Sequence, residues 1–84
     1  MSMMKKTVVI ERRESLVTVG EKFRIGANVW QCTNVVHDPI HRHVIFLRRL
    51  DGAGNVLKFG KSKMYIQKLF AIALKTKELI KIGP

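Results

Sequence analysis

The order of apolar and polar residues predicts a β-sheet over the first two thirds of the chain. Phe23 and Ile25 lie two residues apart and face one side of a strand, while charged residues occupy the alternate positions. The same period of two runs through residues 29–36. A turn at residues 26–28, which contain glycine and asparagine, joins the two segments. We therefore expect an antiparallel pair of strands here.

A second pair of strands is predicted over residues 42–59. Residues 44–47 are four consecutive apolar residues, as expected of a central strand that is covered on both faces. Phe46 is then a core residue. Residues 51–55 contain two glycines and form a hairpin connector, so residues 56–59 are expected to be the partner strand.

The C-terminal third of the chain predicts a helix. Ser62 is a suitable N-cap for a helix that begins at Lys63 and ends near Lys77. Apolar residues recur there at spacings of three and four and form one face: Ile66, Leu69, Phe70 and Ala73. Residues 79–82 either extend the helix or form a closing strand, and the β-branched Ile80 and Ile82 favour the strand.

These elements fit one small domain that spans residues 1–84. Residues 1–6 are expected to be a flexible basic arm, and the β-branched residues 7–10 a short strand. The fold class expected is mainly β (α+β), a small SH3-like antiparallel barrel of about five strands with one C-terminal helix and a possible closing strand.

Charge is the one extreme feature of the composition. Sixteen Lys and Arg residues against six Asp and Glu residues give a formal net charge of +10. Repulsion of this size favours binding to a polyanion, and it speeds association with phosphate backbones. Nucleic acid is the expected partner, with DNA favoured over RNA, and an acidic protein is the alternative.

The remaining composition limits the compartment and the chemistry. The longest uncharged apolar stretch, residues 69–74, is far shorter than the roughly 20 residues that span a bilayer. The single cysteine, Cys32, excludes an internal disulfide, and no secretory signal opens the chain. We expect a cytoplasmic protein without a cofactor, in which Cys32 is a small buried or half-buried thiol.

One group of residues has the chemistry of a metal or acid–base site: His37, Asp38, His41 and His43. Imidazole and carboxylate groups are common metal ligands and proton carriers. The group lacks a recognised ligand spacing and a second carboxylate, and it surrounds Pro39. A polar loop that leads into a strand is therefore the favoured interpretation, with no metal and no catalysis.

Aromatic residues supply a possible platform for stacked bases: Trp30, Phe46, Phe59 and Tyr65. Because these residues stand at apolar positions of the expected elements, core packing is favoured for Phe46 and Phe59. Stacking remains open for Tyr65 and for Trp30.

Basic residues gather around the expected second pair of strands and the start of the helix. Arginine holds phosphate with two hydrogen bonds and lysine adds point charges, so these side chains are suited to following a nucleic-acid backbone. The expected binding residues are Arg42, Arg48, Arg49, Lys58, Lys61 and Lys63. The alternative is a scatter of solvated charges around the barrel.

The order of segments also resembles a known class of proteins. Residues 21–25, a turn, residues 29–32, residues 44–50, residues 62–74 and residues 79–82 follow one another as in the compact barrel modules of phages and mobile elements, which include small barrel domains of integrase-type transposases. The resemblance implies a DNA-associated accessory role. It assigns no site residue, and the six acidic residues form no recognisable catalytic triad for strand transfer.

Three functions follow as hypotheses. The first is a non-catalytic nucleic-acid-binding module, accessory or regulatory, of phage or mobile-element type. The second is an interaction or inhibitor module that docks a basic face on an acidic protein. The third is a barrel-type ribonuclease toxin, which requires the histidines and an arginine to converge on one pocket.

Overall fold

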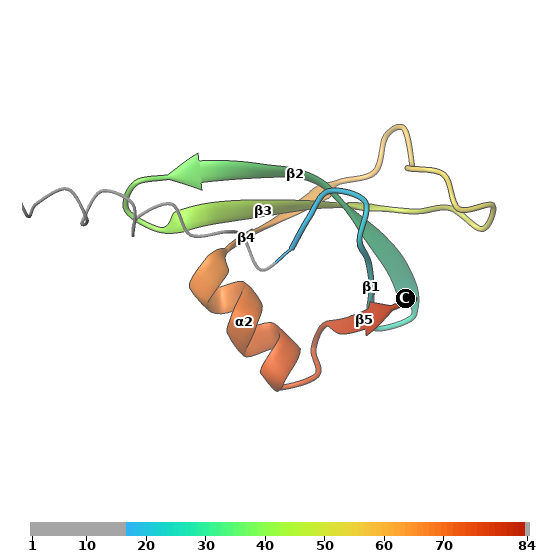
Figure 1. Ribbon diagram of the computed structural model, residues 1–84. Helices are drawn as coiled ribbons and strands as arrows, with labels where there is room; N and C mark the ends of the chain where they lie inside the picture. Colours follow the sequence, from blue (N-terminus) through green and yellow to red (C-terminus); the bar gives the residue numbers. More distant parts are fainter. Residues whose placement is uncertain (1–16, 84) are drawn as a thin grey trace, which may run out of the picture.

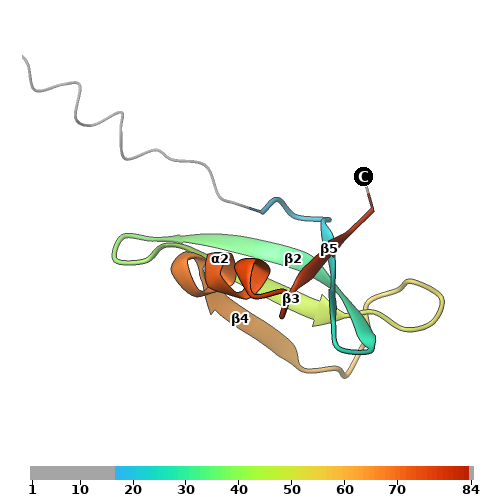
Figure 2. The same ribbon diagram turned by 90° about the horizontal axis from the view of Figure 1, so that it is seen from below.

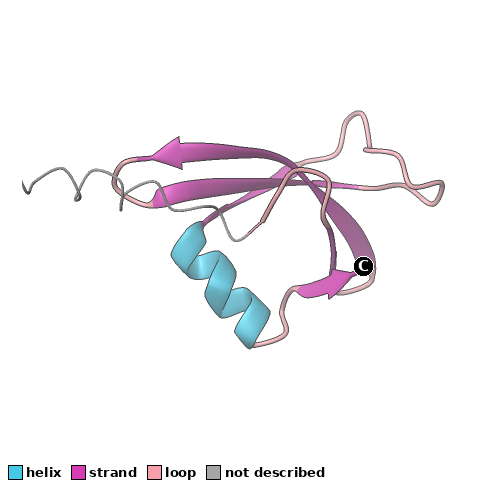
Figure 3. Ribbon diagram, viewed as in Figure 1, coloured by secondary structure: helices cyan, strands magenta, loops and turns pink. Residues whose placement is uncertain are grey.

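A computed structural model describes residues 17–83 and places five antiparallel strands in one sheet, in the order β4-β3-β2-β1-β5. The elements are β1 (Lys22–Ile25), β2 (Asn28–Asp38), β3 (Arg42–Arg49), β4 (Ser62–Ile66), α2 (Gln67–Lys75) and β5 (Ile80–Ile82). The sheet curls into a half-barrel, and α2 lies under its concave face (Figures 1 and 3). The expected fold class is confirmed: mainly β with one C-terminal helix, consistent with a small SH3-like barrel.

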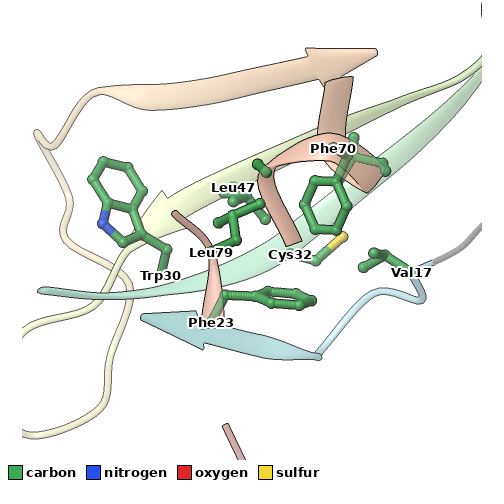
Figure 4. Close-up of a cluster of buried hydrophobic side chains, with 9 residues drawn as sticks. Val17, Phe23, Trp30, Cys32, Leu47, Phe70 and Leu79 are labelled. Atoms are coloured by element: carbon green, nitrogen blue, oxygen red, sulfur yellow. The ribbon is translucent and has the colours of Figure 1, made fainter. Parts of the chain in front are cut away.

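The core lies between the concave face of the sheet and α2. Phe70 of α2 is fully buried and meets the ring of Phe23 edge to face, with 5.2 Å between the centroids. The ring of Tyr65 also meets Phe70 edge to face, with 5.5 Å between the centroids. The buried cluster, drawn in Figure 4, consists of Val17, Phe23, Trp30, Cys32, Ile45, Leu47, Phe70, Ala73 and Leu79.

The turn between β1 and β2 and the closing strand β5 follow the expectation. Ile25 pairs with Asn28, and Gly26 between them has a φ of 62°, a left-handed conformation that glycine adopts without strain. After α2 the chain returns to the sheet, where Phe23 of β1 pairs with Lys81 of β5. The alternative of a longer helix is therefore wrong.

The expectation that residues 44–47 form a central strand covered on both faces is wrong. The central strand is β2, and β3 lies beside it. Ile45 and Leu47 are fully buried on the concave face, whereas Phe46 is only half-buried on the convex face, beside Met64 of β4, which is 63% exposed. The side chains of neighbouring residues in a strand point to opposite faces of the sheet. Two residues of a four-residue apolar run can therefore be buried in the core while the other two lie on a partly exposed surface.

The expected hairpin partner and the start of the helix are also wrong. Residues 56–59 contribute one isolated bridge, between Leu50 and Val56, and the partner of β3 is β4. Ser62 is the first residue of β4 and not the N-cap of a helix. The N-cap position of α2 is occupied by Ile66, whose side chain makes no capping hydrogen bond. Residues 62–66 form hydrogen bonds with the backbone N–H and C=O groups along the edge of β3. These hydrogen bonds stabilise Ile66 in a strand, although its spacing from Leu69, Phe70 and Ala73 also fits a helix.

Two expectations fall on residues 1–16, namely the basic arm and the strand at residues 7–10, and these lie outside the described residues. Within residues 17–83, no helix has the length and apolar character needed to cross a bilayer.

Candidate nucleic-acid interface

Five of the six expected binding residues lie at one end of β3 and β4. Lys63 pairs opposite Leu47, so Lys61 lies just beyond the paired part of β4, near Arg49 at the end of β3. The intervening loop, residues 51–61, brings Lys58 back to the same place through a contact with Arg48. We call this group the basic end; it consists of Arg48, Arg49, Lys58, Lys61 and Lys63.

The structure does not bring Arg42 to the basic end. Arg42 is the first residue of β3, at the tip of the β2–β3 hairpin, and it has a φ of 72°. At about 3.3 Å per residue, the six steps from Arg42 to Arg48 separate the two residues by about 20 Å. In both Figure 1 and Figure 2 the hairpin tip and loop 51–61 project from opposite ends of the molecule.

Arg48 holds loop 51–61 in position. Its half-buried guanidinium donates hydrogen bonds from Nη2 to the carbonyl oxygens of Leu57 at 2.9 Å and Lys58 at 3.4 Å. The Leu57 N–H donates in turn to the carbonyl of Arg49 at 2.9 Å. Arg48 therefore organises the loop, and its guanidinium is less available to a phosphate than the other four basic groups.

Local interactions give the rest of the loop a defined shape. The Oδ1 atom of Asp51 accepts hydrogen bonds from the backbone N–H groups of Ala53 at 2.8 Å and Asn55 at 2.9 Å. At the other end, the Gly60 N–H donates to the Leu57 carbonyl, and a Cβ atom at Gly60 would lie 3.1 Å from Cβ of Leu57. The chain thus turns tightly between Leu57 and Gly60.

This tight turn presents Phe59 to solvent. The side chain of Phe59 is 97% exposed and stands between Lys58 and Gly60. The expectation that Phe59 packs in the core is wrong, because residues 57–60 form a turn and not a strand. The sequence does contain an indication of this turn, because Gly60 directly follows Phe59 and glycine is typical of turns.

Trp30, in contrast, belongs to the core, and the partly buried Tyr65 packs against it. Trp30 is buried, and the ammonium group of Lys63 lies 5.2 Å from the centroid of its indole ring. Figure 4 shows Trp30 at one side of the buried cluster to which it belongs. Its Nε1 atom is buried without a hydrogen-bond partner among the described residues. Trp30 thus joins the core to the basic end.

The basic end carries little compensating negative charge. Within residues 17–83, none of its five basic side chains forms a salt bridge; the salt bridge present joins Lys81 and Glu21 at 3.4 Å, elsewhere in the fold. The hydrogen bond from the backbone N–H of Thr18, more than Lys81, lowers the pKa of Glu21. The one carboxylate in loop 51–61, that of Asp51, is engaged by its own loop.

The histidines lie at the opposite end, around the hairpin tip. His37 and His43 are cross-strand neighbours with rings 5.6 Å apart, whereas His41 lies in the turn and lines a different hollow of about 420 Å³ with Arg42 and Lys68. His37 and Arg42 line a hollow of about 330 Å³. Arg42 therefore borders both hollows, whereas His41 lines the first, His37 lines the second and His43 lines neither of them. No three His, Cys, Asp or Glu residues within 17–83 are grouped to hold a metal.

Cys32 is the small buried thiol expected from the sequence. Its side chain is 1% exposed, and Sγ contacts the Asn34 carbonyl oxygen at 3.6 Å. Burial raises the pKa of Cys32 above its ordinary value, which disfavours the reactive thiolate.

The chain was compared with protein-family models, curated proteins and solved structures, and none of them matches it.

Proposed function

We propose that this chain is a non-catalytic nucleic-acid-binding module whose phosphate contacts come from the basic end. One observation carries the proposal: a structured loop brings basic residues of β3, of β4 and of the loop itself into one group of cations without salt bridges to the described carboxylates. Arginine and lysine side chains in such a group replace the counterions condensed on a phosphate backbone. Within residues 17–83, the side chains of four of them donate no hydrogen bond, and of these only Lys63 has its ammonium group over the Trp30 ring: Arg49, Lys58, Lys61 and Lys63.

The proposal extends to a DNA-associated accessory role. Its support is the net charge of +10 and the resemblance of the segment order to barrel modules of phages and mobile elements. The ribonuclease hypothesis has less support, because His37 and His41 line different hollows and His43 lines neither of the two.

A titration against duplex DNA, single-stranded DNA and RNA at several salt concentrations tests the proposal. If four side chains neutralise phosphates of a duplex, log K falls with log salt at a slope near −3.6, from about −0.9 for each contact. The double variant Arg49→Ala and Lys61→Ala should flatten this slope by about 1.8. The matched control, Arg42→Ala with Lys68→Ala, removes two charges beside the hairpin tip and should leave the slope unchanged.

Other outcomes would contradict the proposal. Absence of salt-sensitive binding to every nucleic acid would exclude the partner class, and capture of one acidic protein in its place would favour the interaction module. Equal losses in both double variants would replace a local interface with a diffuse positive field. Cleavage of RNA that disappears with His41→Ala would establish catalysis.

A further inference from the structure

Phe59 is the aromatic side chain that the described fold exposes most fully, at 97%. Single exposed apolar residues are ordinary on protein surfaces, so exposure alone assigns no role. Phe59 differs in how it is held. The carbonyl groups of the two preceding residues, Leu57 and Lys58, accept hydrogen bonds from Arg48, and the close approach of Gly60 to Leu57 fixes the turn that follows.

The surroundings of Phe59 are cationic. Lys58 and Lys61 flank it in sequence, and the hydrogen bond from the Leu57 N–H to the Arg49 carbonyl keeps the turn beside the end of β3. An aromatic ring between cations matches the two parts of a nucleotide, because the ring stacks on a base while the cations contact phosphates.

We propose that the basic end binds unpaired nucleotides and that Phe59 stacks on a base of single-stranded nucleic acid. In a duplex both faces of each base are covered by neighbouring base pairs, so the ring reaches a base face only where the bases are unpaired or forced apart. The ring therefore adds affinity for single strands, and the lysines add affinity for any nucleic acid. This inference rests on the proposed function, since the phosphate contacts hold the strand beside the ring.

The test is a fluorescence-anisotropy titration of the full chain with labelled oligothymidylate, oligouridylate and a DNA duplex of equal length. Phe59→Ala should weaken binding to the single strands by about 5- to 150-fold, the range measured for loss of one stacked base. It should leave the salt slope and the duplex affinity unchanged, because no charge is removed. Phe59→Trp should retain the affinity, and its added emission should be quenched by oligothymidylate.

Two further variants separate stacking from general hydrophobic contact. Phe59→Leu keeps apolar bulk without an aromatic face and should behave like Phe59→Ala. Ile40→Ala removes a side chain that is 83% exposed at the opposite end of the molecule and should bind as the parent does. Because Phe59 and Ile40 make little contact with the core, circular dichroism should show native folding for all variants.

The outcomes distinguish this inference from the proposed function. Salt-sensitive binding that is unchanged by Phe59→Ala overturns the stacking role and leaves the phosphate interface standing. Equal losses on duplex and single strand overturn the preference for unpaired bases and indicate a wedge between base pairs. A parent chain that binds no nucleic acid overturns both.

Discussion

The two ends of β3 are built alike and differ in charge. At the hairpin tip, Oδ1 of Asp38 accepts hydrogen bonds from the backbone N–H groups of Ile40 and His41. At the other end, Oδ1 of Asp51 likewise accepts hydrogen bonds from two backbone N–H groups of its own loop. Each end also exposes a large apolar side chain almost completely, Ile40 at 83% and Phe59 at 97%.

The difference lies in what surrounds that side chain. Arg42 begins β3 at the tip, whereas the opposite end collects five basic residues and ties its loop to Arg48. Neither exposed apolar residues nor aspartate-stabilised turns distinguish the two ends. The two ends differ in their density of positive charge and in the hydrogen bonds by which Arg48 holds loop 51–61. Substitutions can remove these two properties separately.

The largest effect is expected from removing the charge of the basic end. Replacing Arg49, Lys58, Lys61 and Lys63 together with glutamine should bring the salt slope close to zero. Four phosphate contacts correspond to roughly a thousandfold or more in affinity at 0.1 M salt. Filter-binding measurements on duplex DNA check this, and a variant that retains most of its affinity would move the interface to another part of the fold.

A smaller effect is expected from releasing the loop. Arg48→Ala removes two hydrogen bonds from a half-buried guanidinium to backbone carbonyls and should lower the free energy of unfolding by about 1–2 kcal/mol. For a domain of this size the melting temperature should fall by roughly 5–15 °C. Arg49→Ala, its neighbour, should leave the melting temperature unchanged and flatten the salt slope by about 0.9. Thermal scans that rank the two variants in the opposite order would contradict the assigned roles.

Lys63 connects the basic end to the core, and its loss should have a modest effect on stability. Lys63→Met keeps the apolar stem but removes the ammonium group over the Trp30 ring, which is worth about 0.5–1 kcal/mol. Trp30 is the single tryptophan, so a shift in its emission reports on the contact directly. Lys61→Met is the matched control. A Trp30 spectrum that responds equally to both substitutions would show that the 5.2 Å contact is not specific.

The smallest effect concerns the hairpin tip at low pH. The backbone N–H of Ile40 lowers the pKa of Asp38 below its ordinary value of 3.8, with a smaller contribution from the N–H of His41. A carboxyl whose pKa is depressed by folding stabilises the fold above its unfolded pKa, and this stabilisation is lost as pH falls through the folded pKa. Titration of the Asp38 carboxyl carbon by NMR should give a midpoint below 3.8. Asp38→Asn should leave nucleic-acid affinity unchanged, and a large loss would bring the tip into the interface.

Several features of the fold follow from the sequence because local interactions decide them. The alternation from Lys22 to Ile25 and the glycine turn at residue 26 predict the β1–β2 pair that is observed. Two isoleucines with a lysine between them predict β5. The burial of Cys32 also follows from its place in an alternating strand. In each case period and turn chemistry point to the same element.

The errors cluster where two local patterns compete. Ile66 fits the apolar face of a helix with Phe70 and Ala73, yet it closes β4 because the edge of β3 requires a partner. Phe46 fits a doubly buried strand, yet within residues 17–83 it is α2 that covers the sheet, on the concave face. Which competing pattern prevails depends on contacts between distant segments, and a single sequence does not display these.

The candidate interface shows the same difference between properties set by local sequence and properties set by contacts between distant segments. The sequence by itself determined the excess of cations and the clustering of basic residues from Arg48 to Lys63 along the chain. Only the tertiary structure decided that Arg42 lies at the far end of β3, that Arg48 supports the loop, and that Phe59 faces solvent. The net charge is the sum of the charges of the residues, so the sequence gives it whatever the fold. Exposure and proximity are set by the pairing of β3 with β4, which turns residues 57–60 outward, so they exist only once the chain has folded.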